Sequence, residues 1–138
     1  MYKRQGLLNA TAIEQRSGEL IDGYGVKTPT MHTPTRHLSG GNIQKVVIAR
    51  EFSSSSDALV VAQPTRGVDI GAAEYIHERL LEQRSSGSAI LLISEDLDEI
   101  MQLSDRIIVV LEGEIMGEVS RADATVKDIG LLMAGVTE

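Results

Sequence analysis

Two short apolar runs constrain the fold of this chain most strongly. Residues 58–62 read ALVVA and residues 89–93 read AILLI. Runs of this length without polar alternation are typical of strands buried on both faces of a parallel sheet. Between them, residues 72–84 place apolar side chains at three- and four-residue steps, as an amphipathic helix does. The strand, helix, strand order therefore predicts an α/β fold with a parallel sheet.

Further elements are predicted around this unit. They are a helix over residues 42–52, a hairpin of residues 106–111 and 114–119 that turns at Glu112 and Gly113, and a last helix over about 125–135. The first 38 residues show only weak helical periodicity, around Ile13 to Ile21, and no strand. Two buried strands and a hairpin form a small sheet for 138 residues, so we expect the chain to be part of a larger protein.

Composition excludes several classes of function. Thirteen Lys plus Arg face twenty Asp plus Glu, a net charge of -7, which argues against a general nucleic-acid binder. There is no cysteine, and the three histidines (His32, His37 and His77) lack the spacing of metal ligands, so we expect no resident metal. Residues 1–50 nevertheless hold a balance of +4, while the remainder holds -11. An anion such as phosphate would therefore bind to the first part.

Residues 38–42 (LSGGN) stand immediately before the predicted helix of residues 42–52. Free N–H groups at a helix start, the helix dipole, two glycines and a serine hydroxyl together can bind an anion. The same residues also fit a plain serine N-cap after a flexible turn. On these five residues alone, both interpretations stay open.

The longer string of residues 38–69 resembles the ATP-binding domains of ABC transporters. In that family LSGGQ is the signature motif, the following apolar strand is Walker B, and the segment ending in aspartate is the D-loop. Residues that match are Ser39, Gly40, Gly41, Gln44, Lys45 and Asp69, whereas Asn42 replaces the usual glutamine. The resemblance implies that the signature residues bind the ATP held by a partner domain, and that Asp69 couples the two sites.

Departures from the family pattern lie in the chain's own catalytic half. Walker B should end in Asp-Glu, and these positions are Ala62 and Gln63. Alanine cannot ligate Mg²⁺ and glutamine cannot accept a proton. Glu95 occupies the position of the switch histidine, and no glycine is followed by the lysine of a P-loop. We therefore expect no ATP hydrolysis by this chain alone and no tightly bound nucleotide.

Finer features indicate a subfamily. Residues 62–72, 94–100 and 130–135 are similar to the second ATP-binding domain of tandem-domain subunits that serve bacterial simple-sugar and nucleoside importers. This resemblance implies a truncated α/β, P-loop NTPase-like domain that starts inside a longer subunit. Residues 1–52 would be a helical-subdomain fragment with the signature motif, and residues 53–138 the C-terminal part of the core.

The same resemblance implies the partners and the location. ATP and Mg²⁺ would bind in the full assembly. The partners would be the other ATP-binding domain of the subunit, the transmembrane permease subunits and, indirectly, an extracytoplasmic substrate-binding protein, with no nucleic acid. The subunit would be cytoplasmic and peripheral on the inner face of the plasma membrane.

Three alternatives remain open. The carboxylates of residues 95–99 could form a divalent-metal cluster, although an acidic helix N-terminus explains them better. The chain could be a non-catalytic interaction or regulatory module. It could also be an ABC ATPase outside transport, although the short 81–89 segment leaves no room for the long insertions such proteins carry.

Overall fold

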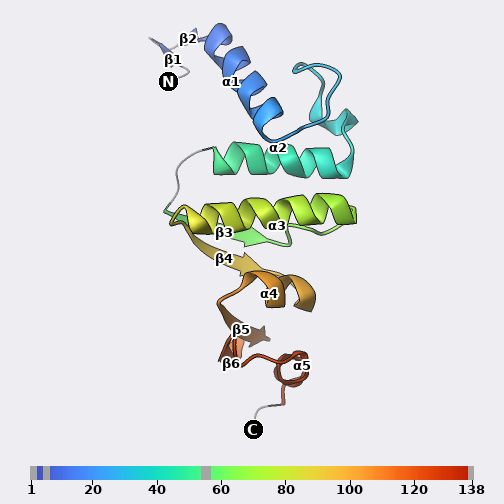
Figure 1. The fold of residues 1–138 in the computed structure, drawn as a ribbon, viewed down its shortest axis with the longest axis vertical. Helices are drawn as coiled ribbons and strands as arrows, with labels where there is room; N and C mark the ends of the chain where they lie inside the picture. The colour runs from blue at the N-terminus through green and yellow to red at the C-terminus, as the bar shows by residue number, and fades with distance from the viewer. Residues whose placement is uncertain (1–2, 5–6, 54–56, 137–138) are drawn as a thin grey trace. The chain divides into compact units, whose positions relative to one another are not determined.

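The computed structural model describes residues 3–4, 7–53 and 57–136 of the chain. Figure 1 shows the order of the elements in these ranges. They are β1 (Lys3–Arg4), β2 (Leu7–Leu8), α1 (Ala10–Gly23), the 3-10 turn η1 (Thr35–His37), α2 (Gly40–Phe52), β3 (Ala58–Ala62), α3 (Ile70–Ser85), β4 (Ala89–Ile93), α4 (Leu97–Leu103), β5 (Arg106–Leu111), β6 (Glu114–Ser120) and α5 (Val126–Met133). They fall into two compact units, residues 1–59 with 64–89 and residues 60–63 with 90–138, which we describe separately.

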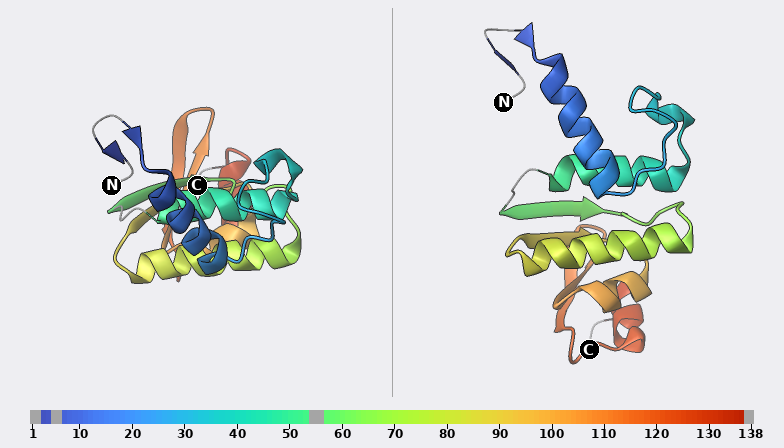
Figure 2. Two further views of the ribbon diagram at one scale, coloured as in Figure 1. Left: turned by 90° about the horizontal axis from the view of Figure 1, so that it is seen from above. Right: turned by 45° about the horizontal axis from the view of Figure 1, so that its top comes forward.

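The first unit is built around the pair α2 and α3, which contact each other and lie side by side in the left-hand view of Figure 2. One face of α3 is buried, because Ala72, Ile76 and Leu80 recur every four residues and are each at most 7% exposed. On α2, Ile48 and Ala49 are buried. Burying these side chains supplies the main apolar stabilisation of this unit.

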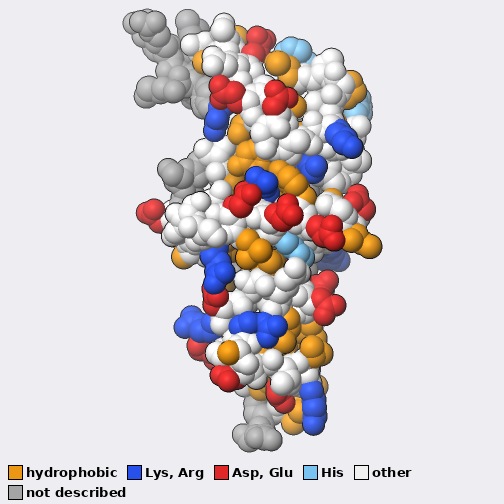
Figure 3. Space-filling model, in the orientation of Figure 1, with side chains coloured by type: hydrophobic (Ala, Val, Ile, Leu, Met, Phe, Trp, Pro, Cys, Tyr) orange, Lys and Arg blue, Asp and Glu red, His pale blue; other side chains and the backbone are white. Residues whose placement is uncertain are grey.

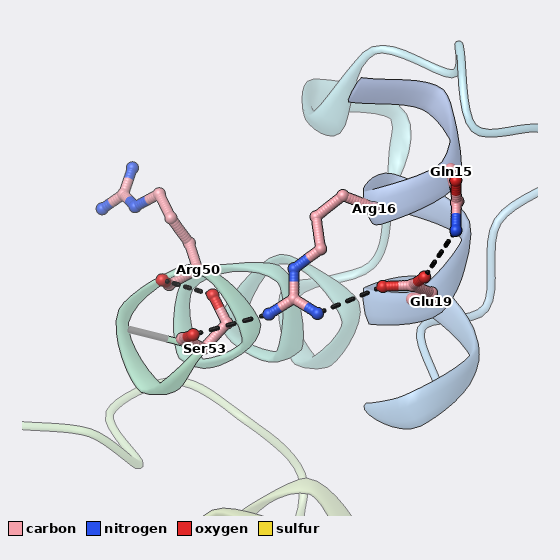
Figure 4. A network of polar contacts seen from close by, with 5 residues as sticks. All are labelled: Gln15, Arg16, Glu19, Arg50 and Ser53. Carbon is pink, nitrogen blue, oxygen red and sulfur yellow. Dashed lines mark hydrogen bonds and ion pairs between the residues drawn. The ribbon is translucent and has the colours of Figure 1, made fainter. Parts of the chain in front are cut away.

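Helix α1 is held against the C-terminal end of α2 by a polar network (Figure 4). The Arg16 guanidinium pairs with Glu19 at 3.2 Å and donates to the carbonyl of Ser53 at 3.4 Å. A cation at the C-terminus of a helix is favourable because the last carbonyls are otherwise unpaired. The sequence indicated this helix only weakly, around Ile13 to Ile21, and none of the residues of α1 is buried in the structure.

Strands β3 and β4 lie at the predicted positions and pair with each other. The Asp57 carbonyl, just before β3, accepts from the N–H of Ala89 at the start of β4. The N–H of Gln63, just after β3, donates to the carbonyl of Ile93 at the end of β4, so the strands are parallel. The expectation of burial on both faces is wrong for this chain. Side chains alternate in burial, and one face leaves Val60 72%, Leu91 57% and Ile93 49% exposed.

The second unit has its own apolar core and contains the predicted hairpin. Strands β5 and β6 are antiparallel, and φ is positive at both Glu112 (50°) and Gly113 (87°), which is the geometry of a type I′ turn. Ile107, Val109 and Ile129 of this unit are at most 6% exposed and pack together. Thr125 caps α5 by accepting from the N–H of Asp128 at 3.1 Å.

Some predicted boundaries shift in the structure. Helix α2 begins at Gly40, two residues earlier than expected, and α3 begins at Ile70 because Asp69 caps it. Near the N-terminus, β1 and β2 form a short antiparallel pair where no strand was predicted. Among the described residues, no helix has both the length and the apolar character needed to cross a membrane.

Candidate functional site

The LSGGN segment forms the N-terminus of α2. Ser39 is the N-cap residue, with extended backbone at φ -66° and ψ 158°, but its side chain accepts no capping hydrogen bond from a backbone N–H of the first helical turn. The first N–H groups of a helix have no partner within the helix, and the helix dipole makes this end positive. Ser39 and Gly40 are exposed and Gly41 is half-buried. The turn therefore presents N–H donors and a hydroxyl to an anion.

Asn42 connects this turn to the segment that follows α1. Its Oδ1 accepts from the backbone N–H of Lys27 at 2.7 Å. Its Nδ2 donates to the Ser39 hydroxyl oxygen at 2.9 Å. The residue that departs from the family pattern thus touches the serine of the motif and is itself held by the backbone.

Asp69 lies beside the same turn, as the N-cap of α3. Its Oδ1 accepts from the N–H of Ala72 at 2.9 Å. A Cβ at Gly41 would lie 3.1 Å from the Cβ of Ala72 and 3.6 Å from Asp69 Oδ2. Glycine at position 41 therefore allows the first turn of α2 to approach the start of α3. The structure brings the predicted signature and D-loop residues together within the first unit.

Behind the turn, α2 and α3 meet at an aromatic side chain that the sequence did not single out. The Tyr75 hydroxyl donates to the Tyr24 carbonyl at 2.9 Å, and Lys45 Nζ lies 4.5 Å from the Tyr75 ring centroid. Arg79 lies 5.2 Å from the same centroid. Burial raises the pKa of Tyr75 above its ordinary value, which keeps the hydroxyl protonated as a donor. No sequence motif marks this cluster, because its partners are 51 residues apart. Gln44, one residue before Lys45, is half-buried.

Three acidic side chains lie along one exposed face of α3. Glu74, Glu78 and Glu82 are exposed and lie one helical turn apart on α3, and Figure 3 shows acidic side chains along this helix. Such a stripe repels anions. An anion is therefore disfavoured along this face of α3, whereas the N-terminus of α2 offers the positive end of a helix dipole with the Asp69 carboxylate beside it.

The predicted Walker B and switch positions lie in the second unit. Ala62 ends β3 and is exposed, and Gln63 follows with a positive φ of 48° while its N–H donates to Ile93 at 2.8 Å. Glu95 is exposed in the turn before α4. In the part of the chain that the structure describes, no group of three His, Cys, Asp or Glu residues could hold a metal ion. These residues do not fit a Mg²⁺ site.

The carboxylates of residues 95–99 instead form a helix start. Asp96 Oδ1 accepts from the N–H groups of Asp98 at 2.9 Å and Glu99 at 3.2 Å, and Glu99 is only 3% exposed. Asp96 is therefore an N-cap, as expected of an acidic helix N-terminus, and its carboxylate is already used by the backbone.

A hollow of about 660 Å³ lies in the first unit between α1, α2 and the segment that joins them. Its wall is mostly apolar, with Leu20, Ile21, Val26 and Val46 among the lining residues, and Arg16 and Arg50 also reach it. This volume is within the range of small-molecule sites.

No family model matches the chain. Curated relatives do match it. The chain is 47% identical over 137 residues to the guanosine import ATP-binding protein of Bacillus subtilis, covering 99% of this chain and 27% of that protein. It is 45% identical to the nucleoside import ATP-binding protein of Lactococcus lactis, with coverages of 96% and 26%. It is 44% identical to a ribose import ATP-binding protein of Clostridium perfringens, with coverages of 84% and 23%. The chain thus spans about a quarter of the length of these relatives.

Solved structures share the fold. A dimeric bacterial ABC transporter cassette superposes with a TM-score of 0.71 at 23% identity, over 87% of this chain and 52% of that one. An ATP-binding subunit of an ABC transporter gives a TM-score of 0.72 at 20% identity, with coverages of 94% and 57%.

Proposed function

Because the chain belongs to the ATP-binding domains of ABC transporters, we propose that it supplies signature and D-loop residues to an ATP molecule held by a partner domain. The observation that carries the proposal is the N-terminus of α2, where Ser39 makes no capping bond to the first helical turn and Asp69 lies beside Gly41. Donors aimed at a phosphate oxygen stabilise the charge that develops there during phosphoryl transfer.

The chain's own half of such a site lacks the groups for hydrolysis. The Ala62 side chain has no oxygen for Mg²⁺, and the Gln63 amide cannot act as a general base. Glu95 would place a negative charge near a γ-phosphate. We propose that this half is catalytically inactive and that the partner domain provides the base, the metal ligands and the phosphate-binding loop.

In the proposed arrangement, the signature turn would contact ATP only at its terminal phosphate. The N–H groups of Gly40 and Gly41 and the Ser39 hydroxyl are donors suited to one anionic oxygen. Bound Mg²⁺ would neutralise phosphate charge, and it would be held by the partner. Gln44 follows the motif and lies near enough in sequence to border the same site.

The relatives are import ATP-binding proteins for nucleosides or sugars, and this supports a transport setting for the chain. We propose that this chain serves an importer of nucleosides or simple sugars and works with a second ATP-binding domain of the same subunit. Permease subunits and, indirectly, an extracytoplasmic substrate-binding protein complete the assembly. The subunit would be cytoplasmic and peripheral on the membrane. We further propose that residues 1–52 and 53–138 are parts of one partial domain.

Substrate uptake by cells that carry the complete transport system tests this function. Ser39→Arg places a long side chain where the phosphate would bind, and uptake of labelled nucleoside or sugar should be lost. Ser85→Arg, at an exposed position near the end of α3, is the matched control and should transport normally. A pure interaction module would keep transport with Ser39→Arg, and that outcome would contradict the proposal.

A further inference from the structure

Three side chains hold the short corner of residues 24–27 that follows α1. Tyr75 donates its hydroxyl to the Tyr24 carbonyl at 2.9 Å. Lys45 donates to the Gly25 carbonyl at 3.3 Å. Asn42 accepts from the N–H of Lys27 at 2.7 Å. The corner is thus tied to α2 twice and to α3 once.

The hydrogen-bonding chemistry of this corner sets the orientation of the Asn42 amide. A backbone N–H can only donate, so the Asn42 atom that faces Lys27 must be the carbonyl oxygen Oδ1. The other end of the amide, Nδ2, can only donate, and it lies 2.9 Å from the Ser39 hydroxyl oxygen. Ser39 therefore accepts in this pair.

This pairing decides what the Ser39 hydroxyl can still do. A serine hydroxyl has one hydrogen and two acceptor positions. With one acceptor position occupied by Asn42, the hydrogen must point elsewhere, and the side chain accepts no capping bond from a backbone N–H of α2. The hydrogen is left available to a group outside the chain that accepts hydrogen bonds.

We propose that Asn42 is a positioning residue, which directs the Ser39 hydroxyl hydrogen toward the terminal phosphate of ATP and takes its own orientation from the Lys27 N–H. This inference rests on the proposed function of the signature turn. Asn42 itself need not touch the nucleotide. The Tyr75 and Lys45 contacts act indirectly, because they hold the corner that presents the N–H of Lys27 to Asn42.

Substituting aspartate reverses the direction of the hydroxyl. In Asn42→Asp, a carboxylate oxygen still accepts from Lys27, but the other oxygen can only accept, so the Ser39 hydrogen turns toward it and away from phosphate. Ile43→Asp is the charge-matched control. It adds the same charge one residue along α2, at a position that is 37% exposed, and leaves the Asn42 contacts in place.

The test uses the ¹⁵N-labelled 138-residue chain titrated with inorganic triphosphate and observed by NMR. In the wild-type chain, the amide signals of Ser39 to Asn42 should shift saturably. The apparent affinity should fall about tenfold or more in Asn42→Asp and about twofold or less in Ile43→Asp. Hydrogen-exchange protection of the Lys27 amide should persist in Asn42→Asp, since its acceptor remains. It should be lost in Asn42→Ala.

The outcomes separate this inference from the function on which it rests. Wild-type-like triphosphate binding by Asn42→Asp would overturn the positioning role and leave the phosphate site intact. An equal loss in Ile43→Asp would show that added charge alone explains the effect and would also overturn it. Absence of any shift in the wild-type chain would overturn both the phosphate site and the positioning role.

Discussion

Replacing Tyr75 by phenylalanine should loosen the junction of α1, α2 and α3 by a predictable amount. The substitution removes the O–H that donates to the Tyr24 carbonyl at 2.9 Å. It keeps the ring that Lys45 and Arg79 approach at 4.5 Å and 5.2 Å, so the cation contacts should persist. A neutral hydrogen bond contributes about 1 kcal/mol net, and Tyr75 is half-buried, so water can partly replace the donor. We expect a loss of about 1 kcal/mol, or a fall in Tm of roughly 3–5 °C for a chain of this size.

The same substitution makes a prediction about pH. Burial raises the pKa of Tyr75 in the folded chain above the value in the unfolded chain. The stability that its protonated hydroxyl supplies is therefore fully present below the unfolded pKa, about 10, and is lost as pH rises through the folded pKa. Urea unfolding at pH 8 and at about pH 11 measures this. The wild-type chain should be more stable than Tyr75→Phe at pH 8, and the difference should shrink at the higher pH. Equal midpoints at pH 8, or an unchanged difference at both values, would refute the reasoning.

The remaining predictions concern the apolar core of the second unit, the contact between α2 and α3 at Gly41, and the proposed inactive half of the ATP site. Ile129 is 2% exposed, so Ile129→Ala should cost about 3 kcal/mol and Ile129→Val about 1 kcal/mol in urea unfolding; a cost near zero for alanine would contradict the assigned core. Gly41→Ala should change the free energy of unfolding by less than about 1 kcal/mol, because the gain in helix propensity offsets the 3.1 Å contact with the Cβ of Ala72. The same substitution should abolish the shifts of the NMR amide signals that triphosphate causes. Gln63→Glu restores a carboxylate but no phosphate-binding loop, so phosphate release by the chain should stay at background, and measurable hydrolysis would contradict the inactive half.

Sequence patterns predicted those elements that depend on local residues. The runs at residues 58–62 and 89–93 are the strands β3 and β4, and the Glu112 turn has the expected geometry. Each of these signals lies within a few neighbouring residues. Helix α1 was indicated only by the weak periodicity around Ile13 to Ile21, and none of its residues is buried.

The candidate site likewise combines a feature that local sequence predicts with contacts that only the structure shows. The position of Ser39 at a helix start was readable from the glycines that follow it. The contact between Asn42 and Lys27 spans 15 residues of an irregular segment, and that of Tyr75 with Tyr24 spans 51, so neither leaves a local pattern. Only the packed structure shows that the asparagine of the motif is oriented by a backbone N–H.

ATP hydrolysis by the purified importer assembly tests most directly whether this chain acts on a partner's ATP through its signature turn and not through its own Walker B position. Two substitutions in this chain are compared, Ser39→Arg in the signature turn and Gln63→Asn at the Walker B position. Asparagine tolerates the positive φ of 48° that Gln63 adopts, so this variant should fold normally. If the chain acts on a partner's ATP, Ser39→Arg should lower hydrolysis by about a hundredfold or more, and Gln63→Asn should change it by less than about twofold. A large loss with Gln63→Asn, together with normal hydrolysis by Ser39→Arg, would contradict the proposed role.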